Sequence, residues 1–310
     1  MDKLDSQVIR VLLTGSNGFL GQKLTDFIIS ETSYSLCCTS HSENRNPNST
    51  GYEFEKINLL DSERLEALID RFEPTHIVHT AALTSVEACE QDPDYCKSLN
   101  VDVSRNIANI CKKKNIHLTF LSTDFVFDGK QGPYDELAET KPCNAYGQSK
   151  LDAEQAIIKT GCRAAILRTI LVYGIIADEN RSNLVLWAKG KLEAQESIKV
   201  VADQWRMPTW VDDLAEACLL CIEKNAEGIY HISGDKMYTI KEAVEELADF
   251  WNFDKNLIYP ILAEEIGQAE NRPQKTGFIL DKAIRQLGYK PTPFRESLVY
   301  IDQQFNFFRK

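Results

Sequence analysis

The pair Tyr146 and Lys150 is the clearest sign of chemistry in the sequence. Their four-residue spacing places both side chains on one face of the helix that this stretch opens. A phenol with an ordinary pKa of about 10 is a poor proton donor at neutral pH, and a neighbouring ammonium would lower that pKa by stabilising the phenolate. Thr123 ends a predicted strand upstream, where its hydroxyl would bind the same carbonyl oxygen. The three residues together predict acid catalysis on a carbonyl group, whereas Tyr146 and Lys150 alone also fit a solvated helix face.

A glycine-rich turn near the N-terminus predicts a dinucleotide site. An apolar run at residues 8–13 predicts a parallel strand, and Gly15, Gly18 and Gly21 follow it at three-residue spacing. Such glycines permit a tight turn, close approach of a pyrophosphate and close packing of the next helix, whose free N–H groups bind phosphate. A purely structural turn is the alternative. The cofactor contacts expected here are Gly15, Asn17, Gly18, Phe19, Leu20 and Gly21.

The residues after the second predicted strand, 34–39, bear on the choice of cofactor. Proteins that bind NAD usually carry an acidic residue at this point, where it binds the ribose hydroxyls. Hydroxyl and basic side chains stand here instead, and they suit a 2′-phosphate. We therefore expect NADPH, with NADH as the alternative. The contacts expected in this polar loop are Ser40, His41 and Arg45.

Strands and helices alternate along the next part of the chain. Strands are predicted at 52–59, 76–80 and 116–122, and helices at 61–72, with Asp61 as the N-cap, and at about 94–114. This alternation predicts an α/β fold, a doubly wound parallel sheet of the Rossmann type with its ligand at the carboxyl ends of the strands. Further cofactor contacts are expected from Asn58, Leu59, Ala81, Ala82 and Asn100, as well as from Tyr146 and Lys150.

The second half of the chain is less regular. Helices are predicted at 183–190 and at 211–223, the second one capped near Asp212 and Asp213, and residues from Thr239 onward predict short helices. Strands are predicted at 197–202 and 228–232. We expect a dinucleotide-binding Rossmann domain of residues 1–169 and 212–232, and a smaller, discontinuous C-terminal substrate-binding lobe of residues 170–211 and 233–310.

Composition restricts the class of protein. Hydrophobic residues make up 43% of the chain and charged residues 26%, which is ordinary for a soluble globular protein. The net charge of −11 argues against partners that need a basic surface, namely nucleic acids and anionic membranes. No apolar run approaches the length that crosses a bilayer. We expect a cytoplasmic protein with no nucleic-acid and no membrane partner. A homodimer is compatible with the sequence.

The nine cysteines are an odd number and are scattered along the chain. This distribution predicts reduced thiols rather than disulfides. Cys218 and Cys221 have the spacing of a metal or redox pair, but they lie in a helical apolar pattern with no second pair nearby. We expect them to pack in the core, and we expect no metal site.

The motifs, taken in order, resemble those of the extended short-chain dehydrogenase/reductase superfamily, and within it the dTDP-4-dehydrorhamnose reductases most. The similar segments are TGSNGFLG, HTAALTSVEACEQDP, STDFVFDG, PYDELAETKPCNAYGQSKLDAE, LRTILVYG, VVADQWRMPTWVDDLA and RPQKTGFILD. The resemblance implies a catalytic triad of Thr123, Tyr146 and Lys150, with Lys150 also binding the nicotinamide ribose. It further implies that NADPH reduces the C4 ketone of a nucleotide-linked 6-deoxyhexose while Tyr146 donates the proton.

Two residues depart from the family pattern where the sugar is expected. Phe125 stands where the family usually has Tyr, and Leu171 stands where it usually has Trp. The reductase chemistry is compatible with both departures, but they leave the identity of the sugar open. The expected substrate contacts are Thr84, Val86, Thr123, Asp124, Phe125, Leu171, Arg206 and Arg272.

Basic residues are the natural partners of the nucleotide diphosphate. Arg206 and Arg272 are the main candidates, with Arg181 behind them, and a surface ion pair is the alternative role for each. Asn183 and Trp205 are weaker candidates for contacts with the sugar or the base, because packing explains them equally well.

Other functions on the same fold stay open. A dehydratase needs two acids after the Thr, and here Asp124 is followed by Phe125. An NAD-dependent epimerase would keep its cofactor tightly bound, and the missing acid after the second strand counts against it. A non-catalytic NADP-binding subunit is the third alternative, because the regulatory beta subunit of methionine adenosyltransferase resembles the same reductases.

Overall fold

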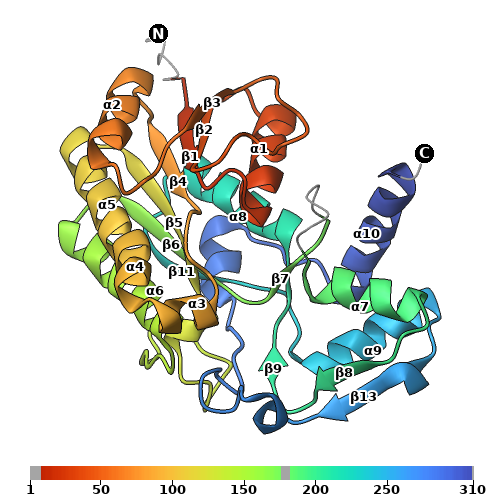
Figure 1. Ribbon diagram of the computed structural model, residues 1–310. Coiled ribbons are helices and arrows are strands. Elements are labelled where there is room, and N and C mark those ends of the chain that lie inside the picture. The colour runs from red at the N-terminus through yellow and green to blue at the C-terminus, as the bar shows by residue number, and fades with distance from the viewer. Residues whose placement is uncertain (1–7, 176–181, 309–310) are drawn as a thin grey trace.

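A seven-stranded parallel sheet forms the centre of the computed structural model, which describes residues 8–175 and 182–308 (Figure 1). The strand order is β11-β6-β5-β4-β1-β2-β3. Its strands are β1 (Arg10–Thr14), β2 (Ser35–Ser40), β3 (Glu53–Lys56), β4 (His76–His79), β5 (His117–Thr123), β6 (Ala164–Thr169) and β11 (Gly228–Ile232). The order reverses between β1 and β4, which is where such sheets bind ligands, and the predicted fold class is confirmed.

Helices cover both faces of this sheet because its central strands are apolar on both sides. Leu13 packs with α1 (Phe19–Glu31) and α8 (Val211–Lys224) on one face. Leu12 packs on the other face with α2 (Ser62–Phe72), α5 (Val103–Lys114) and α6 (Ala145–Thr160). Neighbouring side chains of β1 therefore pack in two different cores, which explains why this strand is an almost continuous apolar run.

The helix predicted at about 94–114 is not continuous. The structure has α3 (Val86–Gln91), α4 (Pro93–Lys97), a π-helical turn (Ser98–Asp102) and then α5. Asp92 caps α4 by accepting a hydrogen bond from Tyr95 N, and Pro93 takes the first helical position. The predicted cap of α2 is confirmed, since the side chain of Asp61 accepts from Arg64 N.

A third hydrophobic cluster lies beyond the sheet, in the C-terminal half of the chain. It gathers α7 and α9 beside two paired strands, β8 and β13, which Figure 1 shows below the C-terminal helix α10. The elements are β7 (Val172–Tyr173), α7 (Leu184–Glu193), β8 (Ile198–Val201), β9 (Trp205–Arg206), β10 (Thr209–Trp210), β12 (Tyr238–Thr239), α9 (Ile240–Trp251), β13 (Ile258–Ile261) and α10 (Phe294–Phe308). The predicted domain boundaries remain a prediction.

Two expectations for this half were wrong. Short helices were expected after Thr239, but this region holds two longer ones, α9 and α10, of 12 and 15 residues, and a capping box of Thr239 and Glu242 starts α9. Asp212 and Asp213 do not cap α8, because they lie in its first turn and Trp210 is the N-cap residue. Asp213 instead accepts hydrogen bonds from Thr292, which ties α8 to the segment before α10.

The expectation of reduced thiols throughout was also wrong. Cys89 of α3 and Cys96 of α4 form a disulfide, and the remaining seven cysteines are free. The break between the two short helices at Asp92 leaves the two Cα atoms 5.1 Å apart, which residue counting does not reveal. Cys218 and Cys221 are fully buried, which confirms their place in the core.

Among the described residues, no three His, Cys, Asp or Glu side chains gather in a way that would hold a metal ion. None of the helices in the described ranges combines the length and the apolar character needed to cross a membrane.

Candidate active site

The glycine turn leads from β1 into α1 with no room for side chains at two positions. Gly15 has a φ of +76°, and a Cβ on it would lie 2.6 Å from Ala81 N. A Cβ on Gly21 would clash with Gly15 O. Gly18 is the N-cap residue of α1, and no side chain caps the helix. The first N–H groups of α1 therefore remain available for a pyrophosphate, and the turn fits a dinucleotide.

Asn17 organises the loop that follows β2. Its Nδ2 donates to Ser42 Oγ at 2.9 Å and to Glu43 O at 2.7 Å, and its Oδ1 accepts from Arg45 N at 2.9 Å. The loop that would hold a 2′-phosphate is thus fixed to the glycine turn. Ser40 is buried at the end of β2, whereas His41 and Arg45 are exposed in the loop. Ser42 is a residue that sequence reasoning missed.

The other predicted cofactor residues lie along the same edge of the sheet. Ala81 and Ala82 follow β4 and are partly buried, Leu59 is buried, and Asn58 is exposed with its Oδ1 bound to Leu60 N. Asn100 is buried in the π-helical turn. Their contacts with a cofactor remain predictions.

Asn100 joins the segment after β4 to the catalytic helix. Its Oδ1 accepts from Leu83 N at 2.8 Å, and its Nδ2 donates to Leu83 O at 3.0 Å and to Ser149 Oγ at 2.9 Å. Two predicted substrate residues flank this segment, where Thr84 is exposed and Val86 is buried. The π turn thus supports the path between β4 and α3, and π turns often occur at functional sites.

Helix α6 brings Tyr146 and Lys150 to the carboxyl end of β5, where Thr123 lies. Asn144 caps the helix by accepting from Gly147 N at 2.7 Å. Gly147 lies so close to Phe125 O that a side chain there would clash with it. The sequence thus starts the helix at a defined residue and lets it approach the turn after β5.

Burial dominates the electrostatics of the predicted triad. The pKa of Tyr146 is raised to about 12, mainly by burial; the Thr123 side chain opposes this rise, and Asp124 contributes a smaller part of it. Burial lowers the pKa of Lys150 to about 7, and its Nζ lies 4.1 Å from the centroid of the Phe120 ring. The expected lowering of the Tyr146 pKa by Lys150 is not found, because burial dominates the pKa of both groups and disfavours the charged form of each.

Of the two positions that depart from the family pattern, Phe125 borders this site, and Leu171 follows the carboxyl end of β6. The Phe125 ring meets Tyr146 edge to face, with centroids 5.9 Å apart. Leu171 is partly buried and has a φ of +40°, which is uncommon for a residue with a side chain. Strained backbone of this kind often occurs at functional sites.

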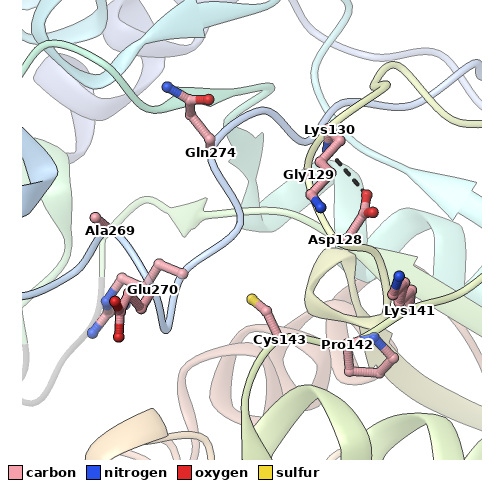
Figure 2. A pocket seen from close by; sticks show the side chains of 10 residues that line it. Asp128, Gly129, Lys130, Lys141, Pro142, Cys143, Ala269, Glu270 and Gln274 are labelled. Atoms are coloured by element: carbon pink, nitrogen blue, oxygen red, sulfur yellow. Dashed lines mark hydrogen bonds between the residues drawn. The ribbon is translucent and has the colours of Figure 1, made fainter.

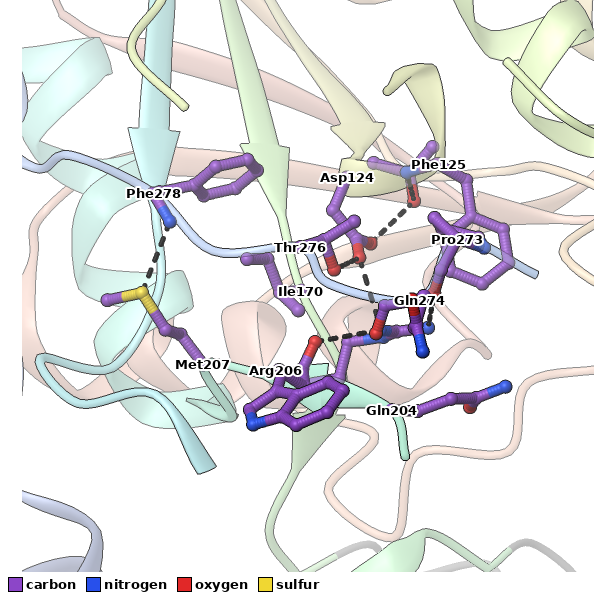
Figure 3. A network of polar contacts seen from close by, with 12 residues as sticks. Asp124, Phe125, Ile170, Gln204, Arg206, Met207, Pro273, Gln274, Thr276 and Phe278 are labelled. Carbon is purple, nitrogen blue, oxygen red and sulfur yellow. Dashed lines mark hydrogen bonds and ion pairs between the residues drawn. The ribbon is translucent and has the colours of Figure 1, made fainter. Parts of the chain in front are cut away.

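Arg206 is buried rather than open to solvent, and its guanidinium is already bound by the protein. Nη1 donates to Trp205 O at 2.7 Å and to Gln274 O at 3.2 Å, and Nη2 donates to Pro273 O at 2.7 Å. Figure 3 shows these contacts beside Asp124. The predicted contact of Arg206 with a diphosphate remains a prediction, and it would have to replace some of these bonds.

Arg272 belongs to the C-terminal half of the chain and contacts a helix beside the sheet. Its Nη2 pairs with Glu87 of α3 at 2.6 Å, while its Nε is buried without a hydrogen-bond partner. Asn183 caps α7 and also donates to Gly174 O, so both of its amide atoms are used inside the protein. Trp205 lies in β9. Arg181 lies outside the described residues.

A pocket of about 360 Å³ opens between the segment after β5, the segment before α6 and the segment around Arg272 (Figure 2). Its lining carries three cationic side chains, those of Lys130, Lys141 and Arg272. Sequence reasoning missed Lys130 and Lys141, although both lie within the stretch that carries the catalytic motif. The complete lining is Asp128, Gly129, Lys130, Lys141, Pro142, Cys143, Ala269, Glu270, Arg272 and Gln274.

Known proteins resemble this chain over most of its length. Methionine adenosyltransferase 2 subunit beta of Xenopus laevis is 32% identical over 291 residues, which are 92% of this chain and 85% of that protein. The probable low-salt glycan biosynthesis reductase Agl14 of Haloferax volcanii is 26% identical over 298 residues, 95% of this chain and 97% of that protein.

A solved structure is also similar to this chain over most of its length. The dTDP-4-dehydrorhamnose reductase of Bacillus anthracis, in complex with NADP, is 27% identical and superimposes with a TM-score of 0.81 over 96% of this chain and 100% of that one. The family of the RmlD substrate binding domain matches residues 9–306, so the chain belongs to that family, within the extended short-chain dehydrogenases/reductases.

Proposed function

We propose that the protein reduces the C4 ketone of a nucleotide-linked 6-deoxy-4-ketohexose, with hydride from NADPH and a proton from Tyr146. The observation that carries this proposal is the convergence of Thr123, Tyr146 and Lys150 at the carboxyl end of β5, at the same sheet edge as the uncapped start of α1. Membership in a family that includes dTDP-4-dehydrorhamnose reductases supports it.

Each residue of the site has its own role in the proposed reduction. The nicotinamide, when bound, supplies the hydride. The hydroxyls of Thr123 and Tyr146 bind the carbonyl oxygen, and Tyr146 gives its proton as the oxygen gains negative charge. Lys150, buried one helical turn from Tyr146, binds the nicotinamide ribose and is protonated below a pH of about 7. Holding the ketone between these groups supplies much of the rate by proximity.

NADPH is the proposed cofactor because the loop after β2 carries Ser40, His41, Ser42 and Arg45 and is fixed by Asn17. Its acidic residue, Glu43, is paired with Lys56 at 2.7 Å. NADH is the weaker alternative. The pocket beside α6 is the proposed place of the nucleotide diphosphate, where Lys130, Lys141 and Arg272 would offset the negative charge of the protein as a whole.

A second candidate function has a specific observation in its favour. The identity to methionine adenosyltransferase 2 subunit beta, 32%, exceeds that to the probable glycan biosynthesis reductase, 26%. The chain would then be a non-catalytic NADP-binding subunit of another enzyme. An NAD-dependent epimerase is a further alternative, but no residue of the site favours it over the reductase.

The experiment follows NADPH oxidation with a dTDP-4-dehydro-6-deoxyhexose generated in place, beside NADH and a Tyr146→Phe variant. We expect turnover that prefers NADPH and falls about a hundredfold or more in the variant, because the proton donor is lost. NADPH binding, followed by nicotinamide fluorescence, should be unchanged in the variant. Full activity of Tyr146→Phe would rule out the proposed donor.

Binding of NADPH without turnover of any nucleotide-linked ketosugar would favour the non-catalytic subunit. That alternative is then tested by mixing the protein with the catalytic subunit of a methionine adenosyltransferase. A change in its rate of S-adenosylmethionine formation would support the subunit, and no change would leave it without support.

A further inference from the structure

A row of buried polar side chains crosses the central sheet beside the predicted catalytic threonine. Ser122 of β5, Arg168 of β6 and His231 of β11 lie opposite one another in the parallel ladders, and all three are buried. Two residues earlier on the same face, β5 and β6 carry the apolar side chains of Phe120 and Ile166. The proposed reduction uses none of the three polar residues, so the row requires an explanation of its own.

Glu154 of α6 is buried against this row and binds two of its members. Arg168 Nε donates to Glu154 Oε1 at 3.0 Å, and Arg168 Nη2 donates to Oε2 at 2.7 Å. Ser122 Oγ donates to the same Oε1. Burial lowers the pKa of His231 to about 3, so its neutral ring donates from Nδ1 to Tyr134 O and accepts from Arg168 Nη1 at Nε2. Each nitrogen of the guanidinium therefore has an acceptor.

Glu154 continues the side of α6 that carries the predicted catalytic residues. Tyr146, Lys150 and Glu154 follow one another at four-residue spacing, so they lie along one side of the helix. Lys150 and Glu154 are both buried. The carboxylate of Glu154 thus joins the helix that carries Tyr146 to Ser122, whose neighbour in the chain is Thr123.

The apolar contacts of α6 with the sheet do not by themselves define where the helix lies along β5. Ala153 and Ile157 of α6 pack in the same core as Phe120 and Ile166, and contacts of this kind have no direction. The Glu154 carboxylate, in contrast, meets its donors only within the narrow geometry of charge-assisted hydrogen bonds. A buried ion pair adds little stability compared with an apolar pair, so its value here lies in specifying one arrangement.

We propose that Glu154 is a positioning residue that fixes α6 along β5, with Arg168 as the partner that holds its carboxylate in place. This role rests on the proposed function, in which the hydroxyls of Tyr146 and Thr123 bind one carbonyl oxygen. Ser122 and Arg168 are paired in the sheet, so they give the carboxylate a fixed target next to Thr123. A helix that moved along the sheet would separate the two hydroxyls that must meet at the carbonyl oxygen.

The first test separates position from stability in the full chain. Arg168→Met alone should lower the urea midpoint strongly, because it leaves a buried carboxylate unpaired. Glu154→Met together with Arg168→Met should recover much of that loss, whereas its kcat should remain about tenfold or more below that of the unchanged protein. NADPH binding should stay within about threefold, because the pyrophosphate site at α1 is untouched. A kcat that recovers together with the midpoint overturns the proposal.

The pH dependence of this loss separates position from charge. Burial lowers the pKa of Lys150 to about 7 and Glu154 raises it, so the double variant would hold the proton of Lys150 only at lower pH. A loss that arose from this charge alone would disappear in acid. We expect the loss in kcat to persist over the whole range from about pH 5.5 to 8. A loss that disappears toward the acidic end overturns the positioning role.

Ser122→Ala is a milder variant that keeps both charges of the pair. It removes the hydrogen bond that joins Glu154 to the strand that carries Thr123. We expect kcat to fall by about threefold or more, because the catalytic helix is then less firmly held beside that strand. This variant decides the question if the double variant does not fold, and an unchanged kcat would count against the proposal.

Asp213→Asn is the matched control for losing a buried carboxylate. Asp213 joins α8 to another segment by accepting from Thr292 N and from Thr292 Oγ1, both at 2.7 Å. Helix α8 packs on the opposite face of the sheet from α6. This variant should lower the urea midpoint and leave kcat unchanged. A fall in kcat as large as that of the double variant would show that the effect is not specific to Glu154, and would overturn the proposal.

Crystal structures of the unchanged protein and of the double variant, each with NADP, do not depend on turnover. We expect α6 to be displaced along β5 by about 0.5 Å or more, while β1 and α1 stay in place. If the unchanged protein reduces no nucleotide-linked ketosugar, the proposed function fails, and this comparison alone decides the role of Glu154. The proposal is overturned if the hydroxyls of Tyr146 and Thr123 keep the same separation in both structures.

Discussion

Lys150 shows at the residue scale what burial does to a functional group. Its ammonium is 3% exposed and rests against the Phe120 ring, so the folded protein disfavours the charged form. Its pKa of about 7 lies below the ordinary value of 10.5. Between these two pH values the unfolded chain binds more protons at this residue than the folded protein does. The free energy of unfolding should therefore rise with pH across that window.

Replacing the lysine makes this contribution measurable. Lys150→Met should be more stable than the unchanged protein at pH 7, and its advantage should shrink by up to about 1.4 kcal/mol for each pH unit above 7. Urea unfolding of both proteins between pH 7 and 9 measures the difference, and the comparison cancels the groups that they share. A constant difference over this range would mean that Lys150 keeps an ordinary pKa in the folded protein.

At the scale of elements, the contact of α6 with the turn after β5 determines where Tyr146 lies. Gly147→Ala would place a methyl group against Phe125 O, so the helix would have to shift away from Thr123. We expect kcat to fall by about tenfold or more, with NADPH binding retained, because small displacements in a catalytic group are costly. Activity within twofold of the unchanged protein would show that the helix position is not critical.

Gly190 offers the matched control for that substitution. It lies inside α7, and a Cβ on it would meet nothing within 4 Å. Gly190→Ala should leave kcat unchanged and stabilise the protein by about 0.5–1 kcal/mol, because alanine favours the helix over the unfolded chain.

Local patterns predicted the sheet well and the site only in part. The apolar strands, the glycine turn and the cap at Asp61 are encoded by neighbouring residues, and each lies where the sequence predicts it. Two of the three carbonyls that bind Arg206, those of Pro273 and Gln274, come from residues more than sixty positions away, so no local pattern reports that it is buried. The bond between Cys89 and Cys96 depends on where one short helix ends and the next begins, at Asp92, and the prediction of a single helix at about 94–114 missed this break.

At the scale of the whole molecule, the ion pair of Arg272 with Glu87 joins the C-terminal half of the chain to a helix beside the sheet. Arg272 would bind the substrate diphosphate in the proposed function, but it is paired with Glu87 in the structure. One further contact crosses nearby, from Asn144 Nδ2 to Asn271 O at 2.8 Å. Glu87 therefore competes with an anionic ligand in a protein whose net charge is already −11.

Removing this competitor should help the substrate to bind. Glu87→Gln should lower KM for the nucleotide sugar by about threefold or more and leave KM for NADPH unchanged, because Arg272 then loses a charged partner that the diphosphate must displace. Glu66→Gln, which removes the partner of Lys113 on the surface of α2, is the control. A higher KM in Glu87→Gln would instead assign the pair to holding the site closed around the substrate.

The C-terminal segment that fills the main core has a consequence for how the chain is made. Ala283, Leu287 and Tyr289 pack in the same core as α1 and α8, and Tyr289 Oη donates to Ser233 O at 2.9 Å. A nascent chain therefore lacks part of this core until residue 289 has left the ribosome, although the last strand of the sheet ends at Ile232. Chains released early, with every strand of the sheet present, should still expose apolar surface and depend on chaperones.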